Sequence, residues 1–475
     1  MLAHPGFWSV VQQLGRKVVA YGIFLLLGAL LAPGDFGIVA LASTAIALMT
    51  IFADLGFVAA LVQREELTAD HINAVFALNV AASAVLAGVG VLLSWPLAAI
   101  YKTPTLQPVL IALSLGFFIN GLGQTQMALA QRSLRFRDLA LRDLTGTMAG
   151  GVVAVAMALR GFGVWSLVAQ ALVTAVVGTA LLWRLSPWRP TWHRVPLAGL
   201  RDLWGYSSGV MVFSILKFFT QNSDTLLVGL LTGPVLLGYY NFGSKVTIAP
   251  ITVLAGAVGS YLFASLARLQ SDRQRLRDSY LRYSEAMLTV ALPALTVMAL
   301  IGPLVLPAIL GDRWRPIGPL IPPFSAAAAV LVLISPVGNL LKAVGRVGWL
   351  TAWSAMFTTA VLALVALGSR WGVLGVAIGY TVAHLLAGTV AVSMLQRSIG
   401  VRGPQVLRTM RTGVALSALI AASIVLARIV PGIATPGRVA LGLLASGASL
   451  SLYARYIGVG EVGRAIERWR QEASA

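Results

Sequence analysis

The sequence contains no cysteine, and only 11% of its 475 residues are charged. The absence of cysteine excludes disulfide bonds, a thiol nucleophile and cysteine-ligated metal sites. Soluble domains carry about 25% charged residues, whereas this chain is 58% hydrophobic with a mean hydropathy of +0.85. We therefore expect a polytopic membrane protein. The first apolar run follows Arg16 and Lys17, is long enough to span, and lacks a small-residue cleavage site, so we expect no cleavable signal peptide.

The chain also lacks any polar stretch long enough to form a soluble domain. Apolar runs of about 20 residues can cross a bilayer as helices. Such runs predict an all-α fold with about fourteen transmembrane helices. Their approximate bounds are 14–32, 36–60, 72–95, 107–130, 143–159, 164–183, 204–231, 235–263, 283–310, 317–341, 349–368, 372–396, 409–427 and 436–457.

Acidic residues are scarce, since 16 Asp and Glu face 35 Lys and Arg, for a formal net charge of +19. On the fourteen-helix topology, about 26 of the 35 basic residues fall on the side that holds both termini, and about 7 on the other. The positive-inside rule then predicts that both termini are cytoplasmic. This asymmetry, without a basic segment long enough to fold separately, favours orientation and contact with anionic lipid over nucleic-acid binding.

Two apolar stretches resemble each other at a constant shift. Gly28, Pro33 and Gly37 in the first correspond to Gly229, Pro234 and Gly238 in the second. Proline fixes φ and glycine tolerates positive φ, so the matched set predicts a duplicated helical hairpin. A second match joins the starts of the sixth and twelfth predicted helices. Because six is an even number, both halves share one orientation, which is a parallel repeat.

The repeat predicts the organisation of the chain. We expect an N-terminal six-helix lobe over 1–184, a cytoplasmic inter-lobe linker over 185–203, a C-terminal six-helix lobe over 204–400, and two additional helices with a cytoplasmic tail over 401–475. Two six-helix bundles related in this way are typical of transporters that open a central cleft to alternate sides of the membrane.

Ionisable and amide side chains within apolar helices are candidates for a substrate cavity. A charge at the centre of a spanning helix costs about 2.5–3.5 kcal/mol, so it faces protein or a wet cavity. Six candidates lie on the seventh and eighth predicted helices, namely Lys217, Gln221, Asn222, Asp224, Asn241 and Lys245. They indicate a hydrophilic wall whose lysines meet an anionic substrate. The alternative is that Lys217 snorkels toward the interface and that Asp224 caps or pairs.

The second predicted helix carries a stripe of small and polar residues, Ser43, Ala47, Thr50 and Asp54, at helical spacing. Asp54 is a candidate proton- or cation-linked carboxylate. The alternative, which we favour, is a structural acceptor near the cytoplasmic end that pairs with Arg64 or a backbone group.

Amides on two further helices complete the candidates. Asn120 and Gln124 share a face of the fourth helix, and Asn339 lies on a polar face of the tenth. Amides and hydroxyls along a cleft suit sugar hydroxyls, but they also join helices by hydrogen bonds, and both interpretations stay open. His384 is alone in its helix, which favours a packing role over proton transfer.

Three stretches carry a resemblance to a known family: LAPGDFGIVALASTAIALMTIFADLGFVAALVQREELT, QNSDTLLVGLLTGPVLLGYYNFGSKVTIAP and LFASLARLQSD. They resemble the polysaccharide-exporter (Wzx/WzxC-type) oligosaccharide flippases of the multidrug/oligosaccharidyl-lipid/polysaccharide exporter superfamily. The resemblance implies a bacterial inner-membrane protein that translocates undecaprenyl-pyrophosphate-linked oligosaccharide repeat units to the outer leaflet, for exopolysaccharide, capsule or O-antigen synthesis. We expect no cofactor and no metal. A polysaccharide polymerase and chain-length machinery are candidate partners.

The resemblance also carries over to single positions. Asn222 and Asp224 match an Asn-x-Asp element of the family, and Lys245 falls where relatives often have a basic residue. The chain departs from the pattern at Ala29 and Leu230, where many relatives have arginine. A mechanism that needs arginine at those corners is therefore not expected here.

Two other classes of function compete with this interpretation. A cation-coupled drug or metabolite antiporter of the same fold needs carboxylates deep in a lobe, and only Asp54 and Asp224 qualify. A membrane enzyme that handles sugars needs acid and base residues in long outer loops, whereas the predicted outer loops are short and contain no histidine. No phosphate-binding loop of a nucleotide-driven pump occurs. We therefore expect a transporter and not an enzyme.

Overall fold

The computed structural model describes residues 8, 11–53, 61, 68–191, 201–268, 272–343, 346–429, 444 and 447. Within these ranges, the side chains of residues 11, 53, 201–213, 216, 217, 254–268, 339, 343, 347, 428 and 429 lie outside the description.

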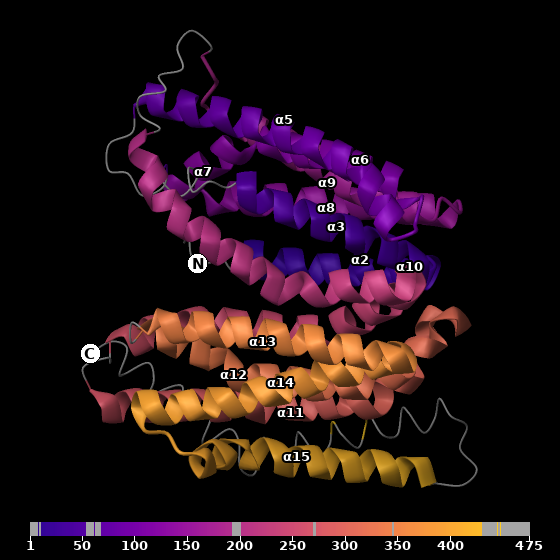
Figure 1. Cartoon of the computed structure of the whole chain (residues 1–475), viewed down its shortest axis with the longest axis vertical. Helices are drawn as coiled ribbons and strands as arrows, with labels where there is room; N and C mark the ends of the chain where they lie inside the picture. The colour runs from indigo at the N-terminus through magenta and orange to yellow at the C-terminus, as the bar shows by residue number, and fades with distance from the viewer. Residues whose placement is uncertain are drawn as a thin grey trace. The chain divides into compact units, whose positions relative to one another are not determined.

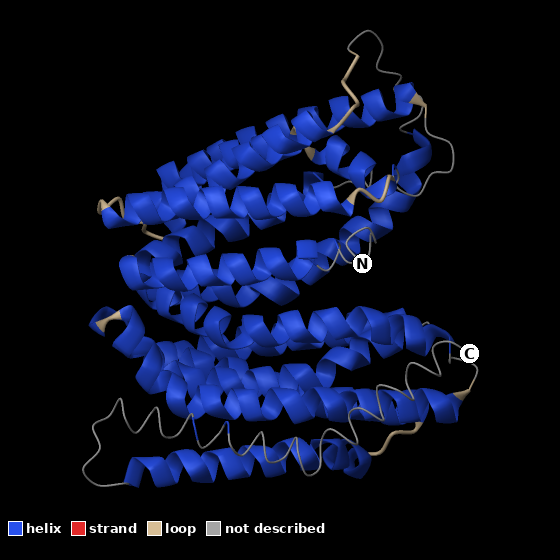
Figure 2. Ribbon diagram, turned by 180° about the vertical axis from the view of Figure 1, so that it is seen from behind, coloured by secondary structure: helices blue, strands red, loops and turns tan. Residues whose placement is uncertain are grey.

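The described part of the chain contains helices and no strand, which confirms the predicted all-α class (Figures 1 and 2). The long helices are α2 (Arg16–Leu30), α3 (Pro33–Ala53), α5 (Ala69–Ile100), α6 (Leu106–Gly121), α7 (Gln124–Arg132), α8 (Phe136–Leu159), α9 (Val164–Leu185), α10 (Arg201–Arg268), α11 (Arg273–Leu310), α12 (Ile321–Ala343), α13 (Val347–Gly368), α14 (Gly372–Ile399) and α15 (Gly403–Ile429). A π-helical turn covers Val11–Gly15, and 3₁₀ segments cover Asp312–Leu320 and Ser369–Trp371.

Among the described residues, 10 helical runs are long and apolar enough to cross a membrane, and 11 if the bent pair α6 and α7 forms one span. The protein is therefore a multi-pass membrane protein. Two of these runs contain two α-helical segments each. One is interrupted at Gly233 (φ 79°, ψ 177°), and the run Gly348–Ile399 contains α13 and α14, which pack against each other. The predicted helix 436–457 lies outside the described residues, and the count of fourteen stays a prediction.

The chain forms two compact units, Met1–Asn241 (unit 1) and Phe242–Ala475 (unit 2). In unit 1, α8 packs on α2 and α9, and α6 packs on α3, α5 and α9. In unit 2, α11 packs on α12 and α15, and α14 packs on α12 and α13. The two units divide within α10, so the predicted lobes 1–184 and 204–400, the linker 185–203 and the segment 401–475 remain predictions.

The two matched corners of the repeat cross each other at their glycines. A Cβ on Gly37 would overlap the backbone carbonyl of Pro234, and a Cβ on Gly238 would overlap the carbonyl of Pro33. All four residues belong to unit 1. Each glycine thus contacts the proline of the other copy, which is the reciprocal pattern of a two-fold contact. Only glycine permits two backbones to approach this closely.

Two side-chain hydrogen bonds lie at or near the crossed corners. The Asp35 carboxylate accepts a hydrogen bond from the Ala32 N–H (3.1 Å) at the start of α3, where the helix dipole favours a negative charge. The Tyr101 hydroxyl, just after α5, donates to the Leu226 carbonyl (3.3 Å) at the other copy. Burial raises the pKa of the Tyr101 phenol above its ordinary value, so the hydroxyl keeps its proton at neutral pH.

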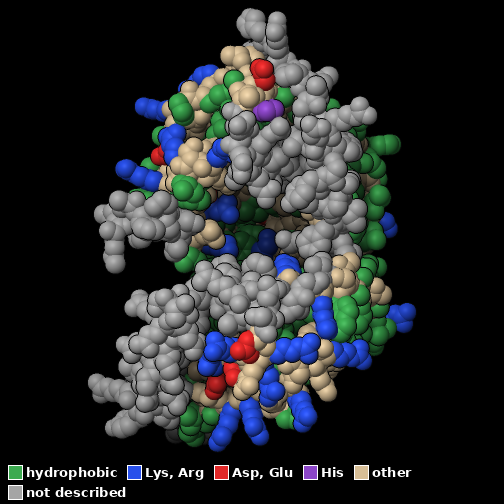
Figure 3. Space-filling model, turned by 90° about the vertical axis from the view of Figure 1, so that its left-hand side faces the viewer, with side chains coloured by type: hydrophobic (Ala, Val, Ile, Leu, Met, Phe, Trp, Pro, Cys, Tyr) green, Lys and Arg blue, Asp and Glu red, His purple; other side chains and the backbone are tan. Residues whose placement is uncertain are grey.

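One end of unit 2 is strongly basic. It holds the starts of α11 and α15 and the ends of α12 and α14, and the exposed residues there include Arg273, Arg275, Arg282, Lys342, Arg397, Arg402, Arg408 and Arg411. Figure 3 shows Lys and Arg side chains gathered on this end, in the lower part of the view. At the opposite end the exposed basic residues of the described part are Arg313, Arg315 and Arg370. This is the asymmetry that the positive-inside rule uses.

Candidate functional site

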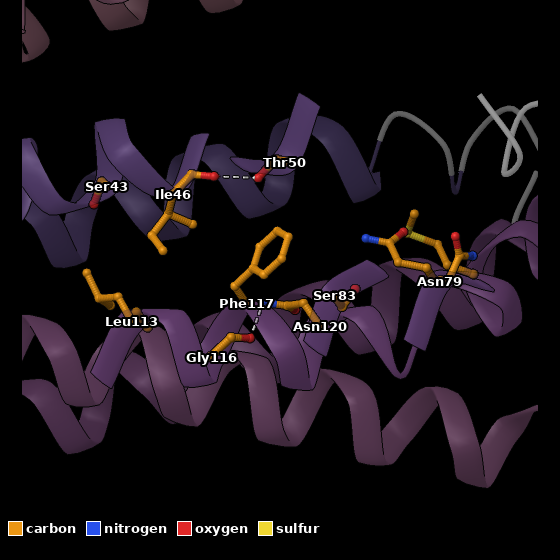
Figure 4. A pocket seen from close by; sticks show the side chains of 12 residues that line it. Ser43, Ile46, Thr50, Asn79, Ser83, Leu113, Gly116, Phe117 and Asn120 are labelled. Atoms are coloured by element: carbon orange, nitrogen blue, oxygen red, sulfur yellow. Dashed lines mark hydrogen bonds between the residues drawn. The ribbon is translucent and has the colours of Figure 1, made fainter. Parts of the chain in front are cut away.

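Unit 1 contains a partly enclosed cavity of about 470 Å³. This volume lies within the range of roughly 300–1,000 Å³ that small-molecule sites occupy. Five helices, α3, α5, α6, α7 and α9, supply its walls (Figure 4). The lining residues are Ser43, Ile46, Thr50, Asn79, Ser83, Leu113, Gly116, Phe117, Asn120, Gln124, Met127 and Ala171.

The wall from α3 is the polar stripe that the sequence predicts. Ser43 and Thr50 are about two turns apart and share one face of the helix. The Thr50 hydroxyl donates to the Ile46 carbonyl (2.9 Å), and its oxygen can still accept a hydrogen bond from the cavity (Figure 4). Asp54, the last member of the stripe, lies outside the described residues.

The facing wall is a broken helix, because α6 and α7 meet at an angle of 41°. The Gly123 N–H donates to a carbonyl three residues back, and Ile119 O instead accepts from the Thr179 hydroxyl of α9 (3.0 Å). Leu122 O accepts from the Trp183 indole N–H, also on α9 (3.0 Å). Irregular backbone is tolerated at membrane depth where protein groups satisfy it. The break is therefore a supported feature of the fold, and it borders the cavity.

The break presents two predicted candidates, Asn120 and Gln124, to the cavity. Asn120 Nδ2 donates to the Gly116 carbonyl (3.0 Å), which fixes the orientation of the amide. Between the two polar walls, the Phe117 ring projects from α6 toward α3 (Figure 4). The cavity thus combines amide and hydroxyl groups with one aromatic face.

Sequence reasoning did not single out the contribution of α5, which is Asn79 and Ser83. Asn79 is 6% exposed, and its Nδ2 is buried with no hydrogen-bond partner in the described structure. Ser83 packs on Gly121, where a Cβ would overlap the serine hydroxyl. Two polar residues four apart in an otherwise apolar helix were the available signal. An unsatisfied buried donor costs about 1–3 kcal/mol, so a group that pairs with Asn79 is favoured.

The candidates on α10 that fall in unit 1 lie elsewhere and are partly committed to local bonds. Gln221 is exposed, and Asn222 Nδ2 donates to the Phe218 carbonyl (3.0 Å) one turn back. Asp224 Oδ2 accepts from the buried Tyr240 hydroxyl (2.7 Å), which lies beyond the break at Gly233. This hydrogen bond joins the two parts of α10 that lie before and after Gly233 (the two arms of α10). A role for it in substrate binding stays a prediction.

The other predicted site residues do not line the described part of this cavity. Asn241 ends unit 1 and is half-buried, whereas Lys245 belongs to unit 2 and is exposed. The side chains of Lys217 and Asn339 lie outside the described residues. Of the ten predicted site residues, the cavity brings together Asn120 and Gln124.

Several other polar residues are packed rather than placed at the cavity. Arg142 pairs with the buried Asp143 (2.7 Å), which also accepts from Gln12 Nε2 (3.0 Å). His384 is 2% exposed, with Nδ1 2.9 Å from the Tyr380 carbonyl. The described part of the chain contains no group of three or more His, Asp or Glu residues that could hold a metal ion.

Comparisons with solved structures identify the fold. A lipid II flippase MurJ structure in an inward closed conformation aligns with a TM-score of 0.73, covering 94% of this chain and 99% of that chain at 9% identity. An inward-facing multidrug resistance MATE family transporter aligns with a TM-score of 0.59, covering 85% and 99% at 15% identity. At these identities the likeness shows the fold alone.

Comparisons of sequence identify the family. The chain is 28% identical to the succinoglycan biosynthesis transport protein ExoT of Rhizobium meliloti over 364 residues, 76% of this chain and 73% of that protein. It is 24% identical to the lipopolysaccharide biosynthesis protein WzxC of Escherichia coli over 390 residues, 80% and 77% of the two chains. The family model described as "Polysaccharide biosynthesis protein" matches residues 26–319. Because that match covers more than half of the sequence, the chain belongs to the polysaccharide biosynthesis protein family, as the resemblance predicted.

Proposed function

We propose that this protein translocates an undecaprenyl-pyrophosphate-linked oligosaccharide from the cytoplasmic to the outer leaflet of a bacterial inner membrane. It would thereby supply repeat units for exopolysaccharide, capsule or O-antigen synthesis. Membership of the family and relatives named for succinoglycan transport and lipopolysaccharide biosynthesis support this assignment. The observation that carries it is the cavity in unit 1, where hydroxyls and amides gather inside apolar helices.

The chemistry of the headgroup explains why such a cavity is needed. A hydroxyl moved from water into an apolar medium without a hydrogen-bond partner costs roughly 2–7 kcal/mol. An oligosaccharide carries many hydroxyls, so its passage through hydrocarbon alone is prohibitive. Side chains such as Asn79, Asn120 and Gln124 replace part of the lost hydration. The prenyl tail needs no such help and would stay in the lipid.

The remaining elements of the mechanism follow from the predicted organisation. We propose alternating access of two lobes, with Lys217 and Lys245 meeting the pyrophosphate and both termini in the cytoplasm. The basic end of unit 2 would then face the cytoplasm and the anionic headgroups of that leaflet. Gln221, Asn222, Asp224, Asn241 and Asn339 stay as further cavity candidates, and Asp54 as a candidate for coupling.

The competing assignment is a cation-coupled drug or metabolite antiporter. The likeness in fold to a multidrug resistance transporter is compatible with it. Such a transporter needs a carboxylate at its site, whereas the described lining of the cavity contains none. Asp224, the described carboxylate on α10, is hydrogen-bonded to Tyr240. Asp54, the other candidate carboxylate, lies outside the described residues, so the choice of a sugar-linked substrate rests on the family and its named relatives.

A depletion experiment tests the proposal. Cells depleted of this protein should accumulate lipid-linked oligosaccharide in the cytoplasmic leaflet and lose surface polysaccharide, as measured by mass spectrometry of extracted lipids and by access of an external glycosidase. Plasmid-borne wild type should restore both. Unchanged lipid-linked pools together with unchanged surface polysaccharide would refute the proposal.

A further inference from the structure

The described lining of the cavity in unit 1 is uncharged. It consists of hydroxyl, amide and apolar side chains, without Asp, Glu, Lys, Arg or His. Among these described residues an anion would lose its hydration without gaining a cationic partner, and a cation would find no carboxylate. The ligand that fits this lining is therefore neutral and rich in hydrogen-bonding groups.

The volume and pattern of the cavity narrow the choice further. About 470 Å³ corresponds to roughly 15 water molecules at about 30 Å³ each. A bound Ca²⁺ ion lies about 2.3–2.6 Å from each of its oxygen ligands, so a calcium site is far smaller than this cavity. The apolar part of the lining includes Ile46, Leu113, Phe117 and Met127 beside the polar groups. A sugar ring has the matching character, because its C–H faces are apolar and its edge carries hydroxyls.

The Asn79 amide offers the cavity a donor that no described residue accepts from. Its side chain is more than nine-tenths buried and lines the cavity, and its Nδ2 has no hydrogen-bond partner in the described structure. A carboxamide offers two donors and one acceptor oxygen in a single plane. That arrangement can bond two neighbouring hydroxyls of a sugar at once. Ser83, one turn further along α5, adds a hydroxyl to the same wall.

We propose that the cavity in unit 1 binds one uncharged sugar ring, with Asn79 Nδ2 donating to a ring hydroxyl and Phe117 packing on the apolar face of the ring. Asn79 is then a specificity-determining residue, while the anionic part of the substrate is bound elsewhere. This inference rests on the proposed function, since it assigns the neutral sugars of the headgroup to this cavity.

The test is saturation-transfer NMR on the purified full-length protein in lipid nanodiscs. The probes are methyl β-D-glucoside, methyl β-D-galactoside and, as an anion of similar size, methyl β-D-glucuronide. At least one neutral glycoside should receive saturation from the protein, and the glucuronide should receive none. Asn79→Leu, which keeps the size but removes the amide, should weaken binding roughly threefold to tenfold, the range for one lost hydrogen bond.

Two further variants keep the result interpretable. Ser94→Ala lies on the same helix, and its buried hydroxyl already donates to the Val91 carbonyl (2.6 Å), so binding should match wild type. Ser43→Leu adds bulk to the cavity from an exposed position on α3, so the protein should fold while binding is lost. If Asn79→Leu does not fold, the comparison of Ser43→Leu with Ser94→Ala decides.

Three outcomes would overturn the inference. The glucuronide could bind as strongly as the neutral glycosides, or Ser43→Leu could bind them as well as wild type does. In the third outcome no glycoside gives a signal, and the cavity holds only water. The depletion experiment is independent of this one. If lipid-linked pools respond but no glycoside binds, this inference fails alone. If glycosides bind but the pools do not respond, the proposed function fails and the sugar site remains.

Discussion

Alanine at Gly37 or Gly238 would test the crossing of the two matched corners. The added Cβ would overlap the Pro234 or the Pro33 carbonyl, and both obstacles are backbone atoms that no side-chain rotation can move aside. Ordinary C···O contacts lie at about 3.3–3.6 Å, so each substitution must open the crossing by roughly 1–2 Å. We therefore expect both variants to be less stable.

The expected magnitude follows from the cost of overpacking, which is typically about 1–3 kcal/mol. For a unit of this size, each kcal/mol lowers the unfolding midpoint by about 2–4 °C. Because both substitutions separate the same two backbones, the second should cost less once the first is present. The Gly37→Ala/Gly238→Ala double variant should therefore lose less than the sum of the single losses.

The measurement is the thermal unfolding midpoint of the purified protein. Samples are heated to a series of temperatures, and the protein that remains folded is quantified by size-exclusion chromatography. The matched control is Gly88→Ala on α5, where a new Cβ meets nothing within 4 Å and the residue is exposed. That substitution should be neutral or stabilising by up to about 1 kcal/mol, because alanine is the better helix former. Midpoints of Gly37→Ala and Gly238→Ala that match Gly88→Ala, or fully additive losses in the double variant, would refute the crossing.

Three further predictions concern hydrogen bonds and charge. Tyr240→Phe should cost about 1–3 kcal/mol of stability in the same melting assay, because Asp224 loses its donor; a wild-type midpoint would contradict the tie between the arms of α10. Trp183→Phe should cost a similar amount, because it leaves Leu122 O at the break between α6 and α7 without the indole N–H; an unchanged midpoint would show that water satisfies the carbonyl. Lys245→Ala should lower polysaccharide export without lowering membrane abundance on immunoblots, and export at the wild-type level would remove it from the anion-binding hypothesis.

Local sequence signals predicted the helices and the corners well. Apolar runs indicate spanning helices because a bilayer requires length and hydrophobicity, and both are properties of a single segment. Proline and glycine at the repeated corner likewise act locally. The break between α6 and α7 escaped prediction, since 107–130 was interpreted as one spanning helix. Gly121 and Gly123, on either side of Leu122, were its signal.

The cavity was only partly predictable because it depends on which helix faces lie together. The faces of α3 and α6 were singled out as polar stripes, and the structure places Ser43 and Asn120 around one space. Asn79 carries no local sign that its amide is left unpaired, since that depends on neighbours in other helices. The hydrogen-bond partner of Asp224 could not be predicted either, because Tyr240 lies beyond the break in α10.

Under the proposed function, the sugar and the pyrophosphate of the substrate would be bound by different parts of this chain. The described lining of the cavity in unit 1 is uncharged, whereas the described candidate cation, Lys245, belongs to unit 2. A cation inside the proposed sugar site would favour acidic sugars over neutral ones and would attract the pyrophosphate away from its own proposed site. An amide-lined cavity instead binds by hydrogen bonds that are individually weak, of about 0.5–1.5 kcal/mol net. Weak, neutral binding suits a transporter because the sugar must leave again on the other side. In this proposal, charged side chains bind the pyrophosphate, which is the same in every substrate, and amides and hydroxyls bind the sugar, which varies. Substitutions could then change one of these properties without the other.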